Sequence, residues 1–135
     1  MSRLPESTQA PKERVIVCGV ILDGQAVEHE GALTEARGLC EASGATVVGE
    51  GIVQKRVKPN PATLMGRGKA EEVAEAVQHH KPDAVVVDND LSPAQVRNLE
   101  KIFCVRVVDR SELILDIFSR RVQTRQSRLQ VELAQ

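Results

Sequence analysis

Residues 84–108 read AVVVDNDLSPAQVRNLEKIFCVRVV, and this stretch decides the fold class. Its first four residues, Ala84–Val87, are apolar at every position, which is typical of a strand covered on both faces of a parallel sheet. The segment SPAQ at residues 92–95 then combines an N-cap serine, a proline in the first turn and a capping-box glutamine. A second β-branched run follows at residues 105–108. We therefore predict a strand, a helix and a second strand.

The same alternation extends over the rest of the chain. Two more strands are predicted at residues 14–22 and 45–55. Helices are predicted at residues 30–43, 69–80 and 92–103, and from Ser111 to the end of the chain. Gly44 and Pro82 mark the ends of the first two helices, because glycine favours a left-handed cap and proline cannot continue a helix.

Strict alternation of strands and helices implies right-handed crossovers and a parallel sheet. The expected fold is an α/β domain at residues 14–110, with a four-stranded, mostly parallel open sheet and flanking helices. A long helical segment, residues 111–135, is expected to follow it. Residues 1–13 are polar, contain two prolines and are expected to form a disordered leader.

The composition excludes several classes of protein. Aromatic residues make up 1% of the chain, so an aromatic platform that stacks nucleic-acid bases is not expected. The net charge of −1 predicts no general affinity for nucleic acids or membranes, and only a local patch of charge would confer one. No apolar run is long enough to cross a bilayer. Cys18, Cys40 and Cys104 include no C-x-x-C pair, so we expect reduced core thiols, no metal site and a cytoplasmic protein.

The final helix has two stripes of side chains. At 100° per residue, the apolar stripe comprises Ile114, Phe118, Val122, Leu129 and Leu133. An adjoining basic group comprises Arg120, Arg121, Arg125 and Arg128. Nothing later in this chain can cover Leu129 and Leu133, so we expect a continuation of the protein or another chain to pack there. From composition alone, the arginines fit two interpretations equally: contact with RNA phosphates, or a solvated face with an Arg128–Glu132 pair.

A glycine-rich turn precedes the helix at residues 69–80. Gly66-Arg67-Gly68-Lys69 differs from a Walker A motif, because the glycines are too close together and alanine follows the lysine. Such a turn can still bind an anion through backbone N–H groups and the helix dipole. The interpretation that we favour is a tight structural turn into the helix.

Carboxylates follow two of the predicted strands at the edge where open α/β sheets bind ligands. Asp88, Asn89 and Asp90 come after one strand, and Asp109 and Arg110 come after the next. The carboxylates could hold Mg²⁺ or take part in acid–base chemistry. We favour loop and N-cap roles for them, with Asp109 and Arg110 tying the last helix to the sheet, because no nucleophile or basic partner is evident. No catalytic residue is predicted.

Residues 90–101, DLSPAQVRNLEK, and residues 108–118, VDRSELILDIF, are two of several long motifs that lie in series. The likeness is to the HflX family of ribosome-associated GTPases, whose LSPxQxRNLE stretch the first motif resembles. It runs on through residues 120–125 and 129–135, RRVQTR and LQVELAQ, while Gly66 to Glu72 matches the GxGKxEE turn. Ser119, Val122 and the pair Gln126-Ser127 depart from the family pattern.

The resemblance implies a protein of three parts: an N-terminal α/β domain, a pair of long antiparallel helices, and a C-terminal G domain that binds GTP and Mg²⁺. It also implies that the N-terminal region docks on the large ribosomal subunit, contacts its rRNA, and takes part in dissociating stalled or inactive ribosomes. On this basis the chain is the first part plus the first helix of the pair. The uncovered Leu129 and Leu133 would then meet the returning helix.

We therefore expect a cytoplasmic, ribosome-associated docking domain without enzymatic activity or a cofactor of its own. Some of Arg120, Arg121, Arg125 and Arg128 are expected to contact rRNA. The alternative is a stand-alone domain that binds ATP or acts as a small enzyme at the carboxyl edge of the sheet. Its residues would be Gly66, Gly68, Lys69, Asp88 and Asp109. The apolar stripe of the final helix could also pair two copies of the chain. We would attribute such a homodimer to truncation of the helical pair.

Overall fold

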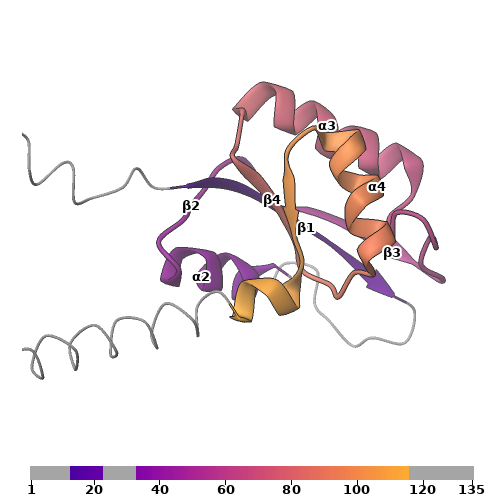
Figure 1. Cartoon of the computed structure of the whole chain (residues 1–135), viewed down its shortest axis with the longest axis horizontal. Coiled ribbons are helices and arrows are strands. Elements are labelled where there is room, and N and C mark those ends of the chain that lie inside the picture. Colours follow the sequence, from indigo (N-terminus) through magenta and orange to yellow (C-terminus); the bar gives the residue numbers. More distant parts are fainter. Residues whose placement is uncertain (1–12, 23–32, 116–135) are drawn as a thin grey trace, which may run out of the picture.

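The chain alternates between strands and helices, as a computed structural model shows for residues 13–22 and 33–115 (Figure 1). The elements are β1 Arg14–Leu22, α2 Thr34–Ala42, β2 Thr46–Val47, β3 Ile52–Arg56, α3 Arg67–His80, β4 Ala84–Val87, α4 Pro93–Phe103 and β5 Arg106–Val108. Residues 110–115 are also helical. β1 and β4 have the bounds that the sequence predicts.

Every pair of neighbouring strands in the sheet is parallel. The order is β2-β1-β4-β5, and β3 also pairs with β1. Val15 pairs with Val47 of β2 and with Ala84 of β4, so these two strands flank β1. Cys18 likewise lies between Ile52 of β3 and β4. β2 and β3 therefore pair with successive parts of the same side of β1. The five strands thus form a sheet that is four strands wide.

The prediction of one continuous strand at residues 45–55 is wrong. The strand breaks between Val47 and Ile52, where Gly49 has a φ of 71° in the left-handed region. A Cβ at Gly49 would lie 2.8 Å from Nε2 of His80, so glycine is needed for the close approach as well as for the backbone conformation. The break lets β2 and β3 pair with different stretches of β1.

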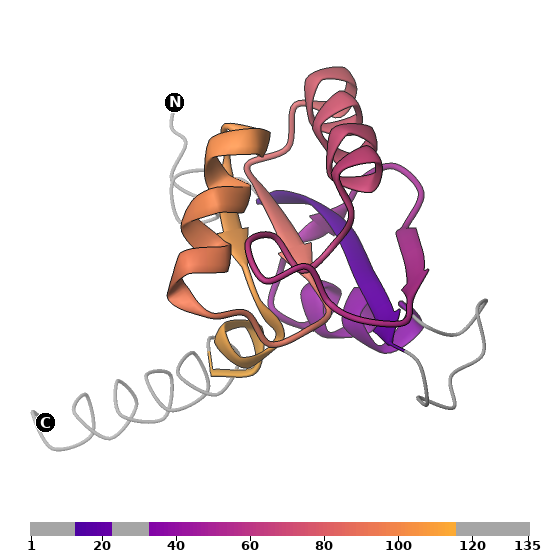
Figure 2. The same ribbon diagram turned by 90° about the vertical axis from the view of Figure 1, so that its right-hand side faces the viewer.

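Helices cover both faces of the sheet, as expected for strands that are buried on both sides. Figures 1 and 2 show α3 and α4 on one face, and α2 with residues 110–115 on the other. Alternate residues of the strands point to the two faces. Ile16 and Val85 belong to the cluster under α3 and α4, whereas Val17 and Val86 belong to the cluster under α2. The predicted mostly parallel sheet with flanking helices is confirmed.

The helix ends largely follow the predicted signals. Ser92 accepts a hydrogen bond from the Gln95 amide at 3.1 Å, and the Gln95 side chain accepts one from the Ser92 amide at 2.9 Å, so the capping box is confirmed. Gly44 follows α2 with a φ of 95°. α3 ends at His80, and its C-cap Lys81 takes the left-handed conformation before Pro82.

Several predicted bounds differ from the structure. α3 begins at Arg67, two residues earlier than predicted, and β5 begins at Arg106, one residue later. α2 begins at Thr34, and the first residues of the helix predicted at 30–43 lie outside the described residues. The predicted final helix is seen at residues 110–115, and its continuation lies outside the described part. No helix among residues 13–22 and 33–115 is long and apolar enough to cross a membrane.

Candidate functional site: the carboxyl edge of the sheet

The carboxyl ends of the parallel strands meet at one edge of the sheet. The chain leaves β1 for the position filled by β2 and β3, and later returns to β4 on the other side of β1. The point between β1 and β4 is therefore the topological switch point, which is the usual ligand crevice of an open α/β sheet. Asp88, Asn89 and Asp90 follow β4 at this point.

Asn89 occupies the switch point with its own side chain. Its Oδ1 atom accepts a hydrogen bond from the Val20 amide at 2.9 Å, and its Nδ2 atom donates one to the Val20 carbonyl at 2.9 Å. The side-chain amide thus takes the place of a strand residue beside β1, beyond the end of β4. A Cβ at Gly19 would lie 3.5 Å from Oδ1 of Asn89 and 3.2 Å from Leu33, so the small residue leaves room for this packing.

Asp109 caps the helix that follows β5. Its Oδ1 atom accepts a hydrogen bond from the Glu112 amide at 2.9 Å, which is the geometry of an N-cap. Its Oδ2 atom accepts one from the Leu91 amide at 3.1 Å. Next to it, Ser111 Oγ donates to Oδ1 of Asp90 at 2.6 Å. Both carboxylates therefore join the two loops that follow β4 and β5.

Asp88 forms an ion pair with Arg110. Nε of Arg110 lies 3.0 Å from Oδ1 of Asp88, and Nη2 lies 3.6 Å from Oε1 of Glu35 on α2. The Asp88 side chain is only 11% exposed. Burial raises its pKa above the ordinary value, and the attraction of Arg110 offsets this only in part. Arg110 thereby connects the last helix with β4 and α2.

The structure brings Asp88, Asp90 and Asp109 to the same edge, as predicted from the sequence. Their partners, however, are backbone amides, Ser111 and Arg110. Within residues 13–22 and 33–115, no group of three or more His, Cys, Asp or Glu residues could hold a metal ion. The arrangement fits the structural interpretation, in which Asp109 and Arg110 tie the last helix to the sheet.

The glycine-rich turn lies next to the end of β3. The Gly66 amide donates to Oε1 of Gln54 at 2.8 Å, and a Cβ at Gly66 would collide with the guanidinium of Arg56. Gly68 has open space around it. Lys69 forms an ion pair with Glu72 at 3.0 Å. The turn therefore fits closely against β3 and leads directly into α3.

The cysteines differ from one another. Cys18 and Cys40 are free and buried, as predicted. Burial, with a contribution from the charge of Asp88, raises the pKa of Cys18 to about 12. Burial, with contributions from the charges of Glu41 and Asp88, raises the pKa of Cys40 to about 11. Cys104 is exposed, so the prediction of a core thiol is wrong there. It forms the left-handed C-cap of α4, and this position at the end of the helix faces solvent.

Two functional contacts were missed by the sequence analysis. Asn89 was placed at the correct edge, but its bonds to Val20 depend on the pairing and register of β1 with β4, which the sequence pattern does not reveal. The contact of Arg110 with Glu35 crosses between elements far apart in the sequence. Arg120, Arg121, Arg125 and Arg128 lie outside the described residues.

The fold defines an α/β domain whose sheet is covered by helices on both faces. At the carboxyl edge of the sheet, the switch point is occupied by the chain's own Asn89 side chain. The model of the family "GTP-binding GTPase N-terminal" matches residues 30–119, and the chain belongs to this family. The matching relatives place it more closely, as the N-terminal domain of HflX.

Three of these relatives are named GTPase HflX. The chain is 40% identical over 124 residues to that of Lacrimispora saccharolytica, covering 92% of this chain and 29% of the relative. It is 46% identical over 103 residues to that of Escherichia coli, covering 76% and 24%. It is 48% identical over 102 residues to that of Thermofilum pendens, again covering 76% and 24%. The chain thus spans less than a third of each relative.

Solved structures of a GTP-binding protein share the fold. One is a GTP-binding protein from the archaeon Sulfolobus solfataricus in complex with GDP, with a TM-score of 0.56 and 19% identity, covering 78% of this chain and 30% of that one. Another is the complex of SsGBP and GDP, with a TM-score of 0.62 and 20% identity, covering 90% and 33%. At these identities the likeness concerns the fold alone.

Proposed function

We propose that this chain is the ribosome-docking domain of an HflX-type GTP-binding protein. In this proposal it binds the large ribosomal subunit and its rRNA in the cytoplasm, and the whole protein helps to dissociate stalled or inactive ribosomes. The family match over residues 30–119 and the relatives named GTPase HflX support the proposal. Residues 14–110 would form the docking domain, and residues 111–135 would begin the helical pair that leads to the G domain.

We assign GTP and Mg²⁺ binding to a G domain outside this chain. The 135 residues contain no G-x-x-x-x-G-K-[ST] loop, which is the segment that cradles nucleotide phosphates in such domains. The chain's own role is then binding and positioning, with no reaction step at its residues. Its partners would be the large subunit, the returning helix and the G domain.

The occupied switch point is the observation that favours this role over a small enzyme or an ATP-binding domain. A ligand at the switch point would have to displace Asn89 from both of its bonds to Val20. The carboxylates nearby already cap a helix or pair with Arg110. Calorimetric titration of the chain with ATP and with GTP tests this directly. We expect no saturable binding of either nucleotide, and saturable ATP binding would support the alternative.

The basic group on the final helix is proposed to contact rRNA phosphates. Replacement of all four arginines, Arg120, Arg121, Arg125 and Arg128, with glutamine should weaken binding to large subunits. It should also reduce the slope of log K against log salt by about 0.7–0.9 for each arginine that contacts a phosphate, and by roughly three units if all four do. The control replaces four basic residues elsewhere, Arg37, Lys55, Lys81 and Arg106. Equal slopes for the two variants would exclude the arginines from the interface.

The helical segment is proposed to be covered by the returning helix of the pair. Ile114 and Leu115 are large apolar side chains that are 49% and 62% exposed at the beginning of this segment. Such exposure favours a partner surface over a solvated helix. Sedimentation equilibrium of the chain measures the competing possibility, a homodimer through the same stripe.

A further inference from the structure

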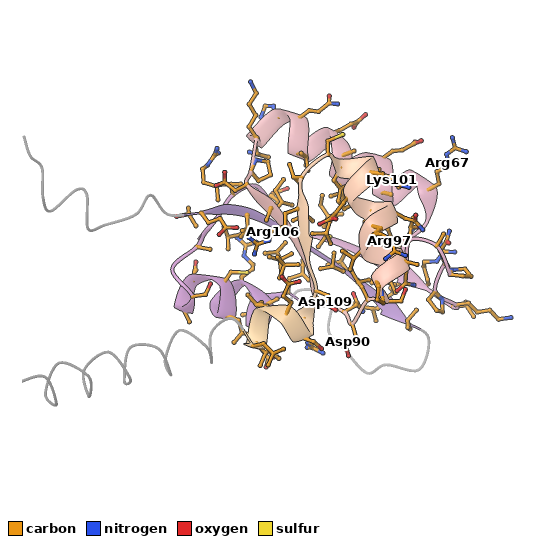
Figure 3. All side chains as sticks on the ribbon, viewed as in Figure 1. Arg67, Asp90, Arg97, Lys101, Arg106 and Asp109 are labelled. Carbon is orange, nitrogen blue, oxygen red and sulfur yellow. The ribbon has the colours of Figure 1, made fainter. Side chains whose placement is uncertain are left out.

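Basic side chains gather around α4 and the two ends of the loop that joins β3 to α3. We call this surface the basic face, and its residues are Arg56, Lys58, Arg67, Arg97 and Lys101. Figure 3 shows Arg97 and Lys101 along α4 and Arg67 at the start of α3, and the two helices pack against each other. Arg97 and Lys101 are one helical turn apart, so both lie on the exposed side of α4.

Hydrogen bonds tie the loop that carries Lys58 to α4 and to β3. The side-chain amide of Gln95 on α4 donates to the Asn60 carbonyl at 3.3 Å, and that of Asn98 donates to the Ala62 carbonyl at 3.0 Å. At the other end, Gln54 accepts from the Gly66 amide at 2.8 Å. Arg56 Nε also donates to the Lys58 carbonyl at 3.0 Å. These hydrogen bonds hold the loop against the helix that carries Arg97 and Lys101.

Most of the charge on the basic face is not neutralised within the described part of the chain. Arg56, Lys58, Arg97 and Lys101 form no ion pair there, whereas Arg67 pairs with Glu71 at 3.5 Å on the surface. The one carboxylate of α4, Glu100, accepts a hydrogen bond from the Val107 amide of β5 at 3.0 Å. Because the chain as a whole carries a charge of −1, this local excess of positive charge is a distinct feature.

We propose that the basic face is a second contact surface for the phosphate backbone of an RNA helix, separate from the arginines of the final helix. This inference rests on the proposed function, and it adds where on the α/β domain the RNA lies. Charges that are spread over α4, a loop and the end of a strand match a row of phosphates better than one small anion, whose charges are concentrated at a point.

The chemistry of the surface also selects the kind of contact. No aromatic side chain is available on it, because the chain has only two phenylalanines, and Phe103 is buried while Phe118 lies outside the described residues. Single-stranded RNA is usually held by stacking on aromatic rings, whereas RNA helices are recognised by shape and by phosphate contacts. We therefore expect binding that depends on helical RNA and on salt, with little dependence on base sequence.

Two matched double variants test the inference. Arg97→Gln with Lys101→Gln removes two charges from the basic face. Lys55→Gln with Arg106→Gln removes the same two residue types elsewhere: Lys55 lies between Gln54 and Arg56 and so points to the opposite face of the sheet, while Arg106 pairs with Glu13. The probe is an RNA duplex of about 16 base pairs, the length that a small RNA-binding domain spans. Binding is measured over a series of salt concentrations.

The basic-face variant should bind the duplex more weakly, and its slope of log K against log salt should fall by about 1.4–1.8, which corresponds to two phosphate contacts. The control variant should keep the slope of the unmodified chain. Equal slopes for the two variants, while the unmodified chain still binds large ribosomal subunits, would overturn the basic face alone. No binding of the unmodified chain to either the duplex or large subunits would overturn the proposed function as well.

Discussion

Asn89 supplies a partner that the sheet itself lacks. β4 ends at Val87 while β1 continues to Leu22, so the amide and carbonyl of Val20 extend beyond the last residue of β4. An asparagine side chain carries both a donor and an acceptor, and can therefore replace a backbone amide. The same two bonds that complete the sheet also occupy the switch point that a ligand would need.

Asn89→Ala should lower the free energy of unfolding by about 1–3 kcal/mol, because both Val20 groups lose their partner at a half-buried position. Urea denaturation measures the loss. Asn98→Ala is the control, since it removes one hydrogen bond at an exposed position and should cost about 0.5–1.5 kcal/mol. A smaller loss for Asn89→Ala than for Asn98→Ala would show that the Val20 contacts contribute little.

Asp88 gives the stability a predictable dependence on pH. Its pKa in the folded chain is raised above the ordinary value of 3.8, so the folded state binds this proton more tightly than the unfolded state. Its contribution is therefore complete below about pH 3.8 and is lost as the pH rises through the folded pKa. The unmodified chain should lose stability relative to Asp88→Asn over that range.

Urea denaturation of the two chains from about pH 4 to pH 7 tests this sign. Comparing the two chains at each pH removes the contribution of the other titrating groups. If the unmodified chain instead gained stability relative to Asp88→Asn with rising pH, the attraction of Arg110 would outweigh the cost of burying the carboxylate.

At the scale of single elements, α4 has the most complete set of local signals. Ser92 and Gln95 form the capping box, proline opens the first turn, and Cys104 closes the helix in the left-handed conformation. Gln95 also donates to the Asn60 carbonyl, so the cap links α4 to the loop of the basic face. Local sequence thus determines both where this helix begins and what it holds in place.

Ser92→Ala should lower the free energy of unfolding by about 1 kcal/mol, whereas Ser92→Gly should lower it by only a few tenths. Both variants lose the hydroxyl that accepts from the Gln95 amide, and glycine costs less because it is better tolerated in the non-helical N-cap conformation. Thermal or urea denaturation of the two variants measures the order. Equal losses would mean that the missing hydroxyl accounts for the whole effect and that the backbone preference of the N-cap position contributes nothing.

The sequence predicted elements well where the signal is local. β1, β4 and α4 depend on apolar runs and caps that are contiguous in the chain. The break between β2 and β3 was missed because it depends on His80 packing over Gly49, thirty-one positions away, and glycine alone does not distinguish a break from a kinked strand. Cys104 was misplaced because its apolar neighbours in the sequence did not show that its side chain is exposed just after the predicted end of the helix.

At the scale of the whole molecule, the alternation of strands and helices was sufficient to predict the layer arrangement. It was not sufficient to predict the strand order. The order β2-β1-β4-β5 places the switch point between β1 and β4, and the sequence could only indicate that carboxylates lie at the carboxyl edge. The basic face is likewise invisible in a chain of net charge −1, because its residues come from three separate segments. Such surfaces require the tertiary structure.

The proposal that this chain docks on the large ribosomal subunit is tested most directly by co-sedimentation with purified large and small subunits at increasing salt. We expect saturable binding to large subunits, little binding to small subunits, and a log K that falls linearly with log salt as phosphate contacts are lost. Absence of saturable binding at low salt, or equal binding to both subunits, would contradict the proposal.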